Sequence, residues 1–100
     1  MVFAAKMTDI EDWGKKVVTV NGLELLLIKA KGTVYACENE CPHQGSPMNG
    51  GLIKDAEHIT CPRHGYNFNL KTGSCTDFPQ YVLKVYAVEI HGDDIMVNLG

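Results

Sequence analysis

The sequence predicts an all-β domain on three observations. Apolar runs of strand length recur along its 100 residues, glycine turns separate them, and no long segment has the 3.6-residue period of a helix. A chain of this length can bury one modest core, so we expect a single domain over residues 1–100.

The N-terminal segment is expected to form a short strand and a turn. Residues 2–6 are predicted as the strand, and Thr8 and Glu11 then stand three residues apart, in the register of a capping box. Trp13 follows and is expected to be a packing residue at the edge of the domain. Nothing in this segment suggests chemistry.

Asn21-Gly22 is the strongest hairpin signal in the chain. These two residues readily adopt the positive φ angles of a type I′ turn, so strands over 16–20 and 23–29 should pair across them. The run from Leu25 to Ile28 is apolar without alternation, which predicts a strand covered on both faces. A further strand over 33–38 follows a second glycine turn.

The second half of the chain predicts shorter strands and a final hairpin. Residues 58–60 are expected to form one short strand, and the alternation of apolar and polar residues at 66–70 predicts another. A long strand over 82–90 should turn at 91–94 and return through 95–99.

Two cysteine–histidine motifs provide the candidate chemistry. Cys41 and His43 flank a proline, and 17 residues later Cys61 and His64 enclose Pro-Arg. Each motif offers one thiolate and one imidazole, a set that can bind a structural zinc ion or an iron–sulfur cluster. Only one residue separates Cys41 from His43, which is a short spacing for two ligands of a single ion. This spacing, together with the recurring proline and glycine, favours the cluster over zinc, which stays the alternative.

The spacing, with Gly45 and Gly65 soon after the two histidines, resembles the Rieske [2Fe-2S] motif, and the resemblance covers the whole chain. It implies one [2Fe-2S] cluster, with both cysteines on an inner iron and both histidines on an outer iron. It also implies an antiparallel β-sandwich with a smaller cluster-binding subdomain, about residues 40–79, at one tip. Glycine lets backbone N–H groups approach the sulfides, while Pro42 and Pro62 restrict φ in the loops.

The two remaining cysteines are predicted to be structural thiols. Cys37 lies in an apolar run, and Cys75 lies in a predicted strand after a turn. Because residues 1–6 are too short for a signal peptide, we expect a reducing compartment in which disulfides are rare. A cluster held by these two residues with Cys41 and Cys61, and without histidine, is an alternative.

Composition argues against several classes of function. The formal net charge is −3 and no basic patch stands out, so nucleic-acid binding is not expected. No apolar run approaches membrane-spanning length, and we expect a soluble, cytoplasmic protein without a membrane partner. Outside the motif only His58 and His91 remain, whereas an oxygen-activating iron needs two histidines and a carboxylate. We therefore expect an electron carrier and not an enzyme.

Residues around the ligands predict the redox type. Respiratory members of the family carry a further cysteine in each loop, where this chain has Ser46 and Arg63, so no bridging disulfide is expected. They also carry a serine and a tyrosine whose hydroxyls donate near the cluster, and here Tyr66 and Phe68 stand at those positions. With fewer donors the midpoint potential should lie near the low end of the Rieske range, roughly −150 mV.

The leading functional hypothesis is a Rieske-type ferredoxin. It would take one electron from a flavin-containing or iron–sulfur reductase and pass it to a terminal oxygenase through the imidazole edges of the two histidines. The alternative is the small Rieske-like subunit of an assimilatory nitrite reductase, which the run 68–75 resembles, although many such subunits lack the ligands. Three acidic residues near the tip, Glu38, Glu40 and Asp77, predict a basic docking face on the partner.

Overall fold

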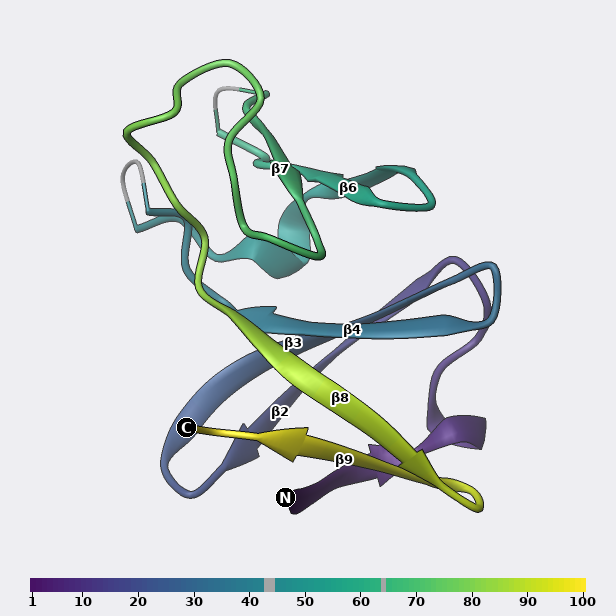
Figure 1. The fold of residues 1–100 in the computed structure, drawn as a ribbon. Helices are drawn as coiled ribbons and strands as arrows, with labels where there is room; N and C mark the ends of the chain where they lie inside the picture. The colour runs from purple at the N-terminus through teal and green to yellow at the C-terminus, as the bar shows by residue number, and fades with distance from the viewer. Residues whose placement is uncertain (43–44, 64) are drawn as a thin grey trace.

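The computed structural model describes residues 1–42, 45–63 and 65–100. Across these residues the fold is almost entirely β, as predicted, with two single-turn 3-10 helices (Figure 1). In chain order the elements are β1 (Val2–Lys6), η1 (Met7–Asp9), β2 (Gly14–Val20), β3 (Leu23–Ala30), β4 (Thr33–Glu38), η2 (Met48–Gly50), β5 (Leu52–Asp55), β6 (His58–Thr60), β7 (Asn67–Asn69), β8 (Val85–His91) and β9 (Asp94–Asn98).

Six strands form the base of the molecule, in the antiparallel order β1-β9-β8-β4-β3-β2. β8 pairs with β4 only where Ala36 faces Tyr86 and Cys37 faces Val85, and beyond this point β8 and β9 cross the β2–β4 strands as a second layer (Figure 1). β5, β6 and β7 form a separate antiparallel sheet beyond β4 (Figure 1). The predicted antiparallel β-sandwich is confirmed, and the smaller sheet lies at one tip.

Both turns predicted before β4 are present. Asn21 and Gly22 have φ angles of 50° and 81°, which confirms the type I′ turn. Lys31 and Gly32, at 51° and 75°, repeat the same left-handed pair between β3 and β4. Because a two-residue turn fixes the register of its strands, these turns place β3 in the centre of a three-strand meander.

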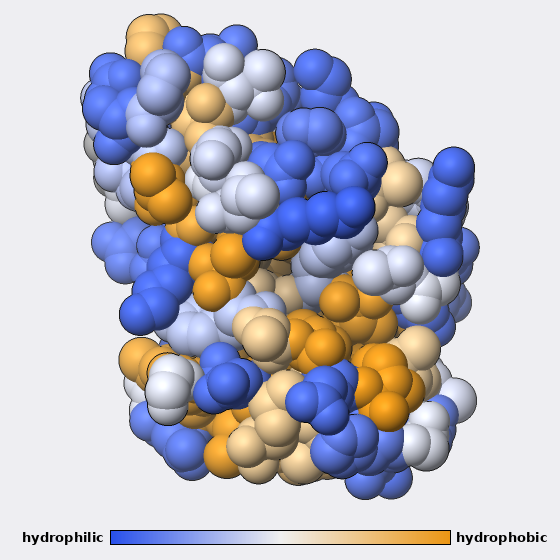
Figure 2. Space-filling view, in the orientation of Figure 1, coloured by the Kyte–Doolittle hydropathy of each residue, from blue (hydrophilic) through white to orange (hydrophobic). Residues whose placement is uncertain are grey.

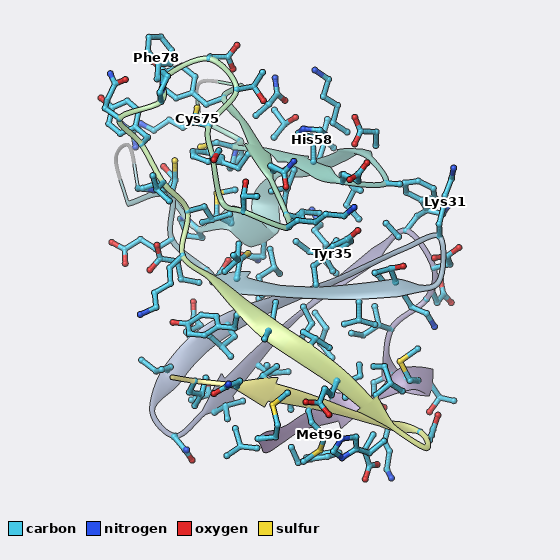
Figure 3. All side chains as sticks on the ribbon, viewed as in Figure 1. Lys31, Tyr35, His58, Cys75, Phe78 and Met96 are labelled. Atoms are coloured by element: carbon cyan, nitrogen blue, oxygen red, sulfur yellow. The ribbon has the colours of Figure 1, made fainter. Side chains whose placement is uncertain are left out.

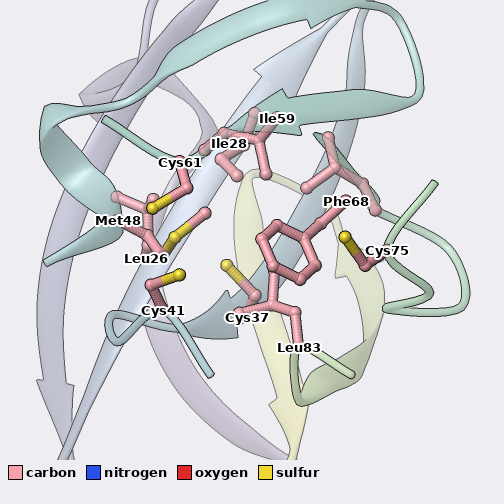
Figure 4. Close-up of a cluster of buried hydrophobic side chains, with 11 residues drawn as sticks. Leu26, Ile28, Cys37, Cys41, Met48, Ile59, Cys61, Phe68, Cys75 and Leu83 are labelled. Atoms are coloured by element: carbon pink, nitrogen blue, oxygen red, sulfur yellow. The ribbon is translucent and has the colours of Figure 1, made fainter. Parts of the chain in front are cut away.

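β3 is buried on both faces, which confirms the prediction from its apolar run. Leu25 and Leu27 enter one core and Leu26 and Ile28 enter another, because successive side chains of a strand point to opposite faces. The base core lies between the two layers of the base and contains Ala5, Ile10, Val20, Leu25, Leu27, Val34, Ala36, Ile95 and Val97. The junction core joins the base to the small sheet (Figure 4) and contains Leu26, Ile28, Cys37, Cys41, Met48, Ile59, Cys61, Phe68, Leu70, Cys75 and Leu83.

The N-terminal turn differs from its prediction. The backbone N–H of Lys6 donates to Asp9 Oδ2 at 2.9 Å, so the cap belongs to η1 and lies two residues before the predicted pair of Thr8 and Glu11. The predicted register is wrong because β1 runs to Lys6, and Asp9 is the carboxylate three residues beyond that strand end. Trp13 is half exposed and lies outside both buried cores.

The strands of the second half differ from prediction in extent. β5 was not predicted, β7 is shorter than the alternation suggested, and β8 begins at Val85 and not at Val82. The cause of the late start is Leu83, which is buried in the junction core and whose N–H donates to Gly73 O at 2.8 Å. This contact holds the chain against the small sheet before it can pair with β4.

The surface differs between the two halves of the molecule. On the face drawn in Figure 2, hydrophilic residues cover most of the half that carries the small sheet, and apolar residues gather over the base. Phe3 and Ile90 are among the exposed large apolar residues of the base strands. None of the described helices is long and apolar enough to span a membrane.

Candidate metal centre

The first cysteine loop, residues 41–46, follows β4 and is closed by two backbone hydrogen bonds. The N–H of Cys41 donates to Ser46 O at 2.8 Å, and the N–H of Gly45 donates to Cys41 O at 2.7 Å. The two bonds bring the ends of the loop together in a tight arch. His43, the ligand predicted in this loop, lies outside the described residues.

The second cysteine loop, residues 61–66, follows β6 and repeats both bonds. The N–H of Cys61 donates to Tyr66 O at 2.7 Å, and the N–H of Gly65 donates to Cys61 O at 3.0 Å. The donors and acceptors stand at the same positions after the cysteine as in the first loop. His64, the ligand predicted here, also lies outside the described residues.

A glycine in the left-handed region closes each arch. Gly45 and Gly65 both stand four residues after their cysteine and have φ angles of 74° and 73°. A side chain in this region costs roughly 1–2 kcal/mol, and a Cβ on Gly45 would also lie 3.3 Å from Glu40 Oε1. The predicted histidines stand two and three residues after their cysteines. The shared feature of the loops is therefore the backbone arch and not the ligand spacing.

Cys41 and Cys61 come together in the junction core. Each is 1% exposed, and in Figure 4 their sulfur atoms lie at the same end of the core, beside Met48. Thiolate is the form of cysteine that ligates a metal, and a buried thiolate is stable only when a cation or hydrogen-bond donors compensate its charge. Two buried sulfurs delivered by two matching arches fit the cysteine-bound half of a two-iron cluster.

The other two cysteines occupy separate places in the junction core. Burial, with a contribution from Glu38, raises the pKa of the Cys37 thiol to about 12, so this residue is protonated at neutral pH. Cys75 forms an isolated bridge with Phe68, and the strand predicted around it is absent from the described chain. All four cysteines are described, buried and without a disulfide, and within the described residues no three potential ligands form a metal-binding group. The all-cysteine alternative gains no support from these positions.

The two histidines outside the motifs each bond one nearby carboxylate. His58 Nδ1 lies 2.8 Å from Asp55 Oδ1, and His91 Nε2 lies 3.0 Å from Glu89 Oε1. In the part of the chain that the structure describes, neither histidine joins a group of three metal ligands. Both occupy ordinary polar positions at the surface.

An aromatic group that the sequence did not reveal packs beside the second loop. The ring centroids of Tyr66 and Phe78 are 4.5 Å apart, and Tyr81 lies 6.2 Å from each of them. Phe78 is 37% exposed at the tip of the molecule, far from the base residue Met96 (Figure 3). The three rings form one aromatic cluster on this side of the loop. Their spacing along the chain carries no local signal, because the contact depends on how the segment after β7 folds back.

The three acidic residues predicted near the tip have different environments. Glu38 Oε1 accepts the N–H of Lys84 at 3.2 Å, and Asp77 Oδ2 accepts the N–H of Asn67 at 3.3 Å. Glu40 is exposed and lies beside the first loop. Of the three, Glu40 is the best placed to meet a charge on a partner.

A family model described as the Rieske [2Fe-2S] domain matches residues 1–87. The ferredoxin component of the naphthalene 1,2-dioxygenase system of Pseudomonas putida is 35% identical over 99 residues, which cover 97% of this chain and 93% of that protein.

Two solved structures share the fold over nearly their whole length. The ferredoxin of carbazole 1,9a-dioxygenase from Nocardioides aromaticivorans IC177 has a TM-score of 0.87 at 26% identity, covering 96% of this chain and 94% of that one. A protein named for the small subunit of an NADPH nitrite reductase has the same TM-score at 22% identity, covering 97% and 96%. The second likeness shows the fold alone.

Proposed function

This chain belongs to the Rieske [2Fe-2S] domain family, and we propose that it is a ferredoxin that carries single electrons from a reductase to a terminal oxygenase. One Rieske-type [2Fe-2S] cluster is the cofactor of the domain, and its role is electron transfer and not catalysis. The observation that carries the proposal is the pair of matching arches that deliver Cys41 and Cys61 to one buried core.

We assign the inner iron to Cys41 and Cys61 and the outer iron to His43 and His64. Motif spacing and the burial of the two sulfurs support this assignment. A cluster bound there supplies a one-electron redox couple. The chain's own contribution is to hold the ligands, since the arches orient the cysteines and the junction core keeps water from the sulfur atoms. Residues 40–79 would then form the cluster-binding subdomain.

The proposed redox type is a low-potential centre without a loop disulfide. Ser46 and Arg63 stand where the respiratory type has its additional cysteines. Phe68 is fully buried in the junction core and has no hydroxyl to donate. Fewer donors leave the reduced state less stabilised, so we expect a midpoint potential of about −150 mV.

The proposed partners follow from the relative's role. The Pseudomonas putida protein is named as the ferredoxin component of a dioxygenase system, and this chain covers 93% of it. We infer a terminal oxygenase as the acceptor and a flavin-containing or iron–sulfur reductase as the donor. Exposed Glu40 beside the first loop suits a partner with a basic face around its own redox centre.

Metal analysis and spectroscopy of the purified protein test the proposal. We expect equal amounts of iron and acid-labile sulfide, and a paramagnetic resonance signal of Rieske type after reduction. Substrate turnover should require reductase, this protein and oxygenase together. Zinc without sulfide, or an unchanged spectrum in His43→Cys and His64→Cys, would refute the ligand assignment.

The nitrite reductase subunit stays the alternative. Its fold is shared, but the identity of 22% carries no functional argument, and this chain keeps both motif cysteines buried together. Stable co-purification with a large sirohaem subunit would favour this role over the ferredoxin.

A further inference from the structure

We propose that Asn39 is a positioning residue that sets the spacing of the two cysteine loops by holding η2 between them. The proposal rests on the assignment of Cys41 and Cys61 as cluster ligands made above. Asn39 lies two residues before Cys41 and is the one buried polar residue in the part of the chain that the structure describes, at 8% exposure.

The Asn39 amide is held by hydrogen bonds on both sides. Its Nδ2 donates to Glu24 Oε2 at 2.8 Å and to Asn49 Oδ1 at 3.2 Å, and its Oδ1 accepts the N–H of Asn49 at 2.8 Å. Its own N–H donates to Glu24 O at 3.3 Å and extends the β3–β4 ladder by one bond. Because the Glu24 carboxylate can only accept, it fixes the orientation of the amide, with Nδ2 toward Glu24 and Oδ1 on the N–H of Asn49.

η2 connects Asn39 to the second loop. Met48, its first residue, is fully buried in the junction core with both motif cysteines. Gly50, its last residue, faces Pro62, since a Cβ added there would lie 3.6 Å from Pro62 Cγ. The following residue, Gly51, leaves no room for movement toward β6, because its Cβ would lie 2.1 Å from Thr60 O.

These contacts form one mechanical connection from the base to both arches. Glu24 at the start of β3 orients Asn39, and Asn39 bonds the backbone and side chain of Asn49. η2 in turn lies beside Pro62, the residue after Cys61. Truncation of Asn39 would leave the N–H of Asn49 without its acceptor and the Glu24 carboxylate without its amide donor. The first arch and η2 would then lose their common anchor.

The first experiment compares Asn39→Ala with Asn69→Ala in the purified, cluster-bearing protein. Asn69 Oδ1 accepts the N–H groups of Lys71 and Thr72 at 2.8 and 3.1 Å, so the control also loses an amide that holds backbone, but in a turn of the small sheet. Residues that orient metal ligands typically change metal affinity by 10–100-fold, so we expect Asn39→Ala to release iron to a chelator about tenfold faster or more. Its paramagnetic resonance lines should broaden, and those of Asn69→Ala should not.

A rescue experiment separates positioning from simple loss of stability. Asn39→Asp alone places two carboxylates together and should release iron as fast as Asn39→Ala. Glu24→Gln with Asn39→Asp restores an amide–carboxylate pair with the roles exchanged, and should recover the slow release and the narrow lines. If Asn39→Ala does not fold, Asn49→Ala, at an exposed position of η2, should show a smaller change in the same direction.

Two results would overturn the proposal. One is an Asn39→Ala or Asn49→Ala protein with the release rate and spectrum of the wild type. The other is a double variant that behaves no better than Asn39→Asp. A wild-type protein that contains no iron and sulfide would instead contradict the proposed function, which keeps the two failures distinct.

Discussion

The two cores on opposite faces of β3 differ in composition and in what encloses them. The buried residues of the base core are all aliphatic, and two-residue hairpins enclose them. The junction core contains all four cysteines with Met48 and Phe68, and arches, a 3-10 turn and short strands enclose it. The base core therefore serves mainly to stabilise the sandwich, while the junction core must also hold the candidate metal centre. Alternate residues of β3 therefore contribute to two cores with different roles.

The largest effect is expected in the junction core, where substitution of two cysteines should remove the cluster and substitution of the other two should not. Cys41→Ser or Cys61→Ser should abolish the cluster, because each removes a proposed ligand from the inner iron. Cys37→Ala and Cys75→Ala should keep it and lose only packing, since Cys37 is a protonated thiol. Iron and sulfide analysis measures the difference. Retention of a full cluster in Cys61→Ser would contradict it.

Neighbouring leucines of β3 offer the most direct comparison of the two cores. Leu26→Ala and Leu27→Ala remove equally buried side chains, and each should lower the free energy of unfolding by about 2–5 kcal/mol. Only Leu26→Ala should also speed iron release, because Leu26 packs in the core with both motif cysteines. Chemical denaturation and chelator kinetics give the two readouts. Equal release rates would show that the cores are not separate in function.

Two glycines with similar positive φ angles test whether the arches affect the cluster as well as the stability of the fold. Gly65, in the second loop, and Gly92, between β8 and β9, have φ angles of 73° and 64°, and a Cβ on either would meet no atom within 4 Å. Alanine at either should therefore cost roughly 1–2 kcal/mol through backbone strain alone. We expect a changed visible circular dichroism spectrum only for Gly65→Ala. The Gly92→Ala protein serves as the control for general destabilisation.

The junction core should also be the core that is sensitive to alkali. Burial raises the pKa of the Cys37 thiol from 9.0 to about 12, so the folded state keeps its proton longer than the unfolded state. The stability linked to this proton is complete below pH 9 and is lost as the pH rises toward 12. Raising the pH from 8 to 11 should therefore lower the free energy of unfolding more in the wild type than in Cys37→Ala. Chemical denaturation at each pH measures the difference. If the free energies of unfolding of the two proteins fell equally with pH, the raised pKa of Cys37 would be contradicted.

The smallest effect is expected at the surface beside the first cysteine loop, outside both cores. Glu40→Lys reverses an exposed charge beside the first loop, and rim charges mainly change association rates. The rate of electron transfer to the oxygenase should fall at low salt and converge with that of the wild type at high salt. The same change at Glu89, on β8, should leave the rate unaltered.

Local sequence predicted the features that depend on neighbouring residues. Asn21-Gly22 predicted its turn because few other pairs adopt two positive φ angles at low cost, and the run from Leu25 to Ile28 predicted burial on both faces. The motif spacing predicted Cys41 and Cys61 as a pair, and both lie in the junction core. These signals lie within a few residues along the chain, where backbone preference and side-chain alternation act.

Other features arose only when distant segments met. Three features depend on contacts between residues ten or more positions apart. They are the late start of β8 at Val85, the packing of Tyr66 on Phe78 and the hydrogen bonds of Asn39 to Asn49. No local pattern marks them, since Asn39 has the same intrinsic preferences as any exposed asparagine. The motif could name the cysteines, but the packing of the small sheet against β3 placed both sulfurs in one buried space.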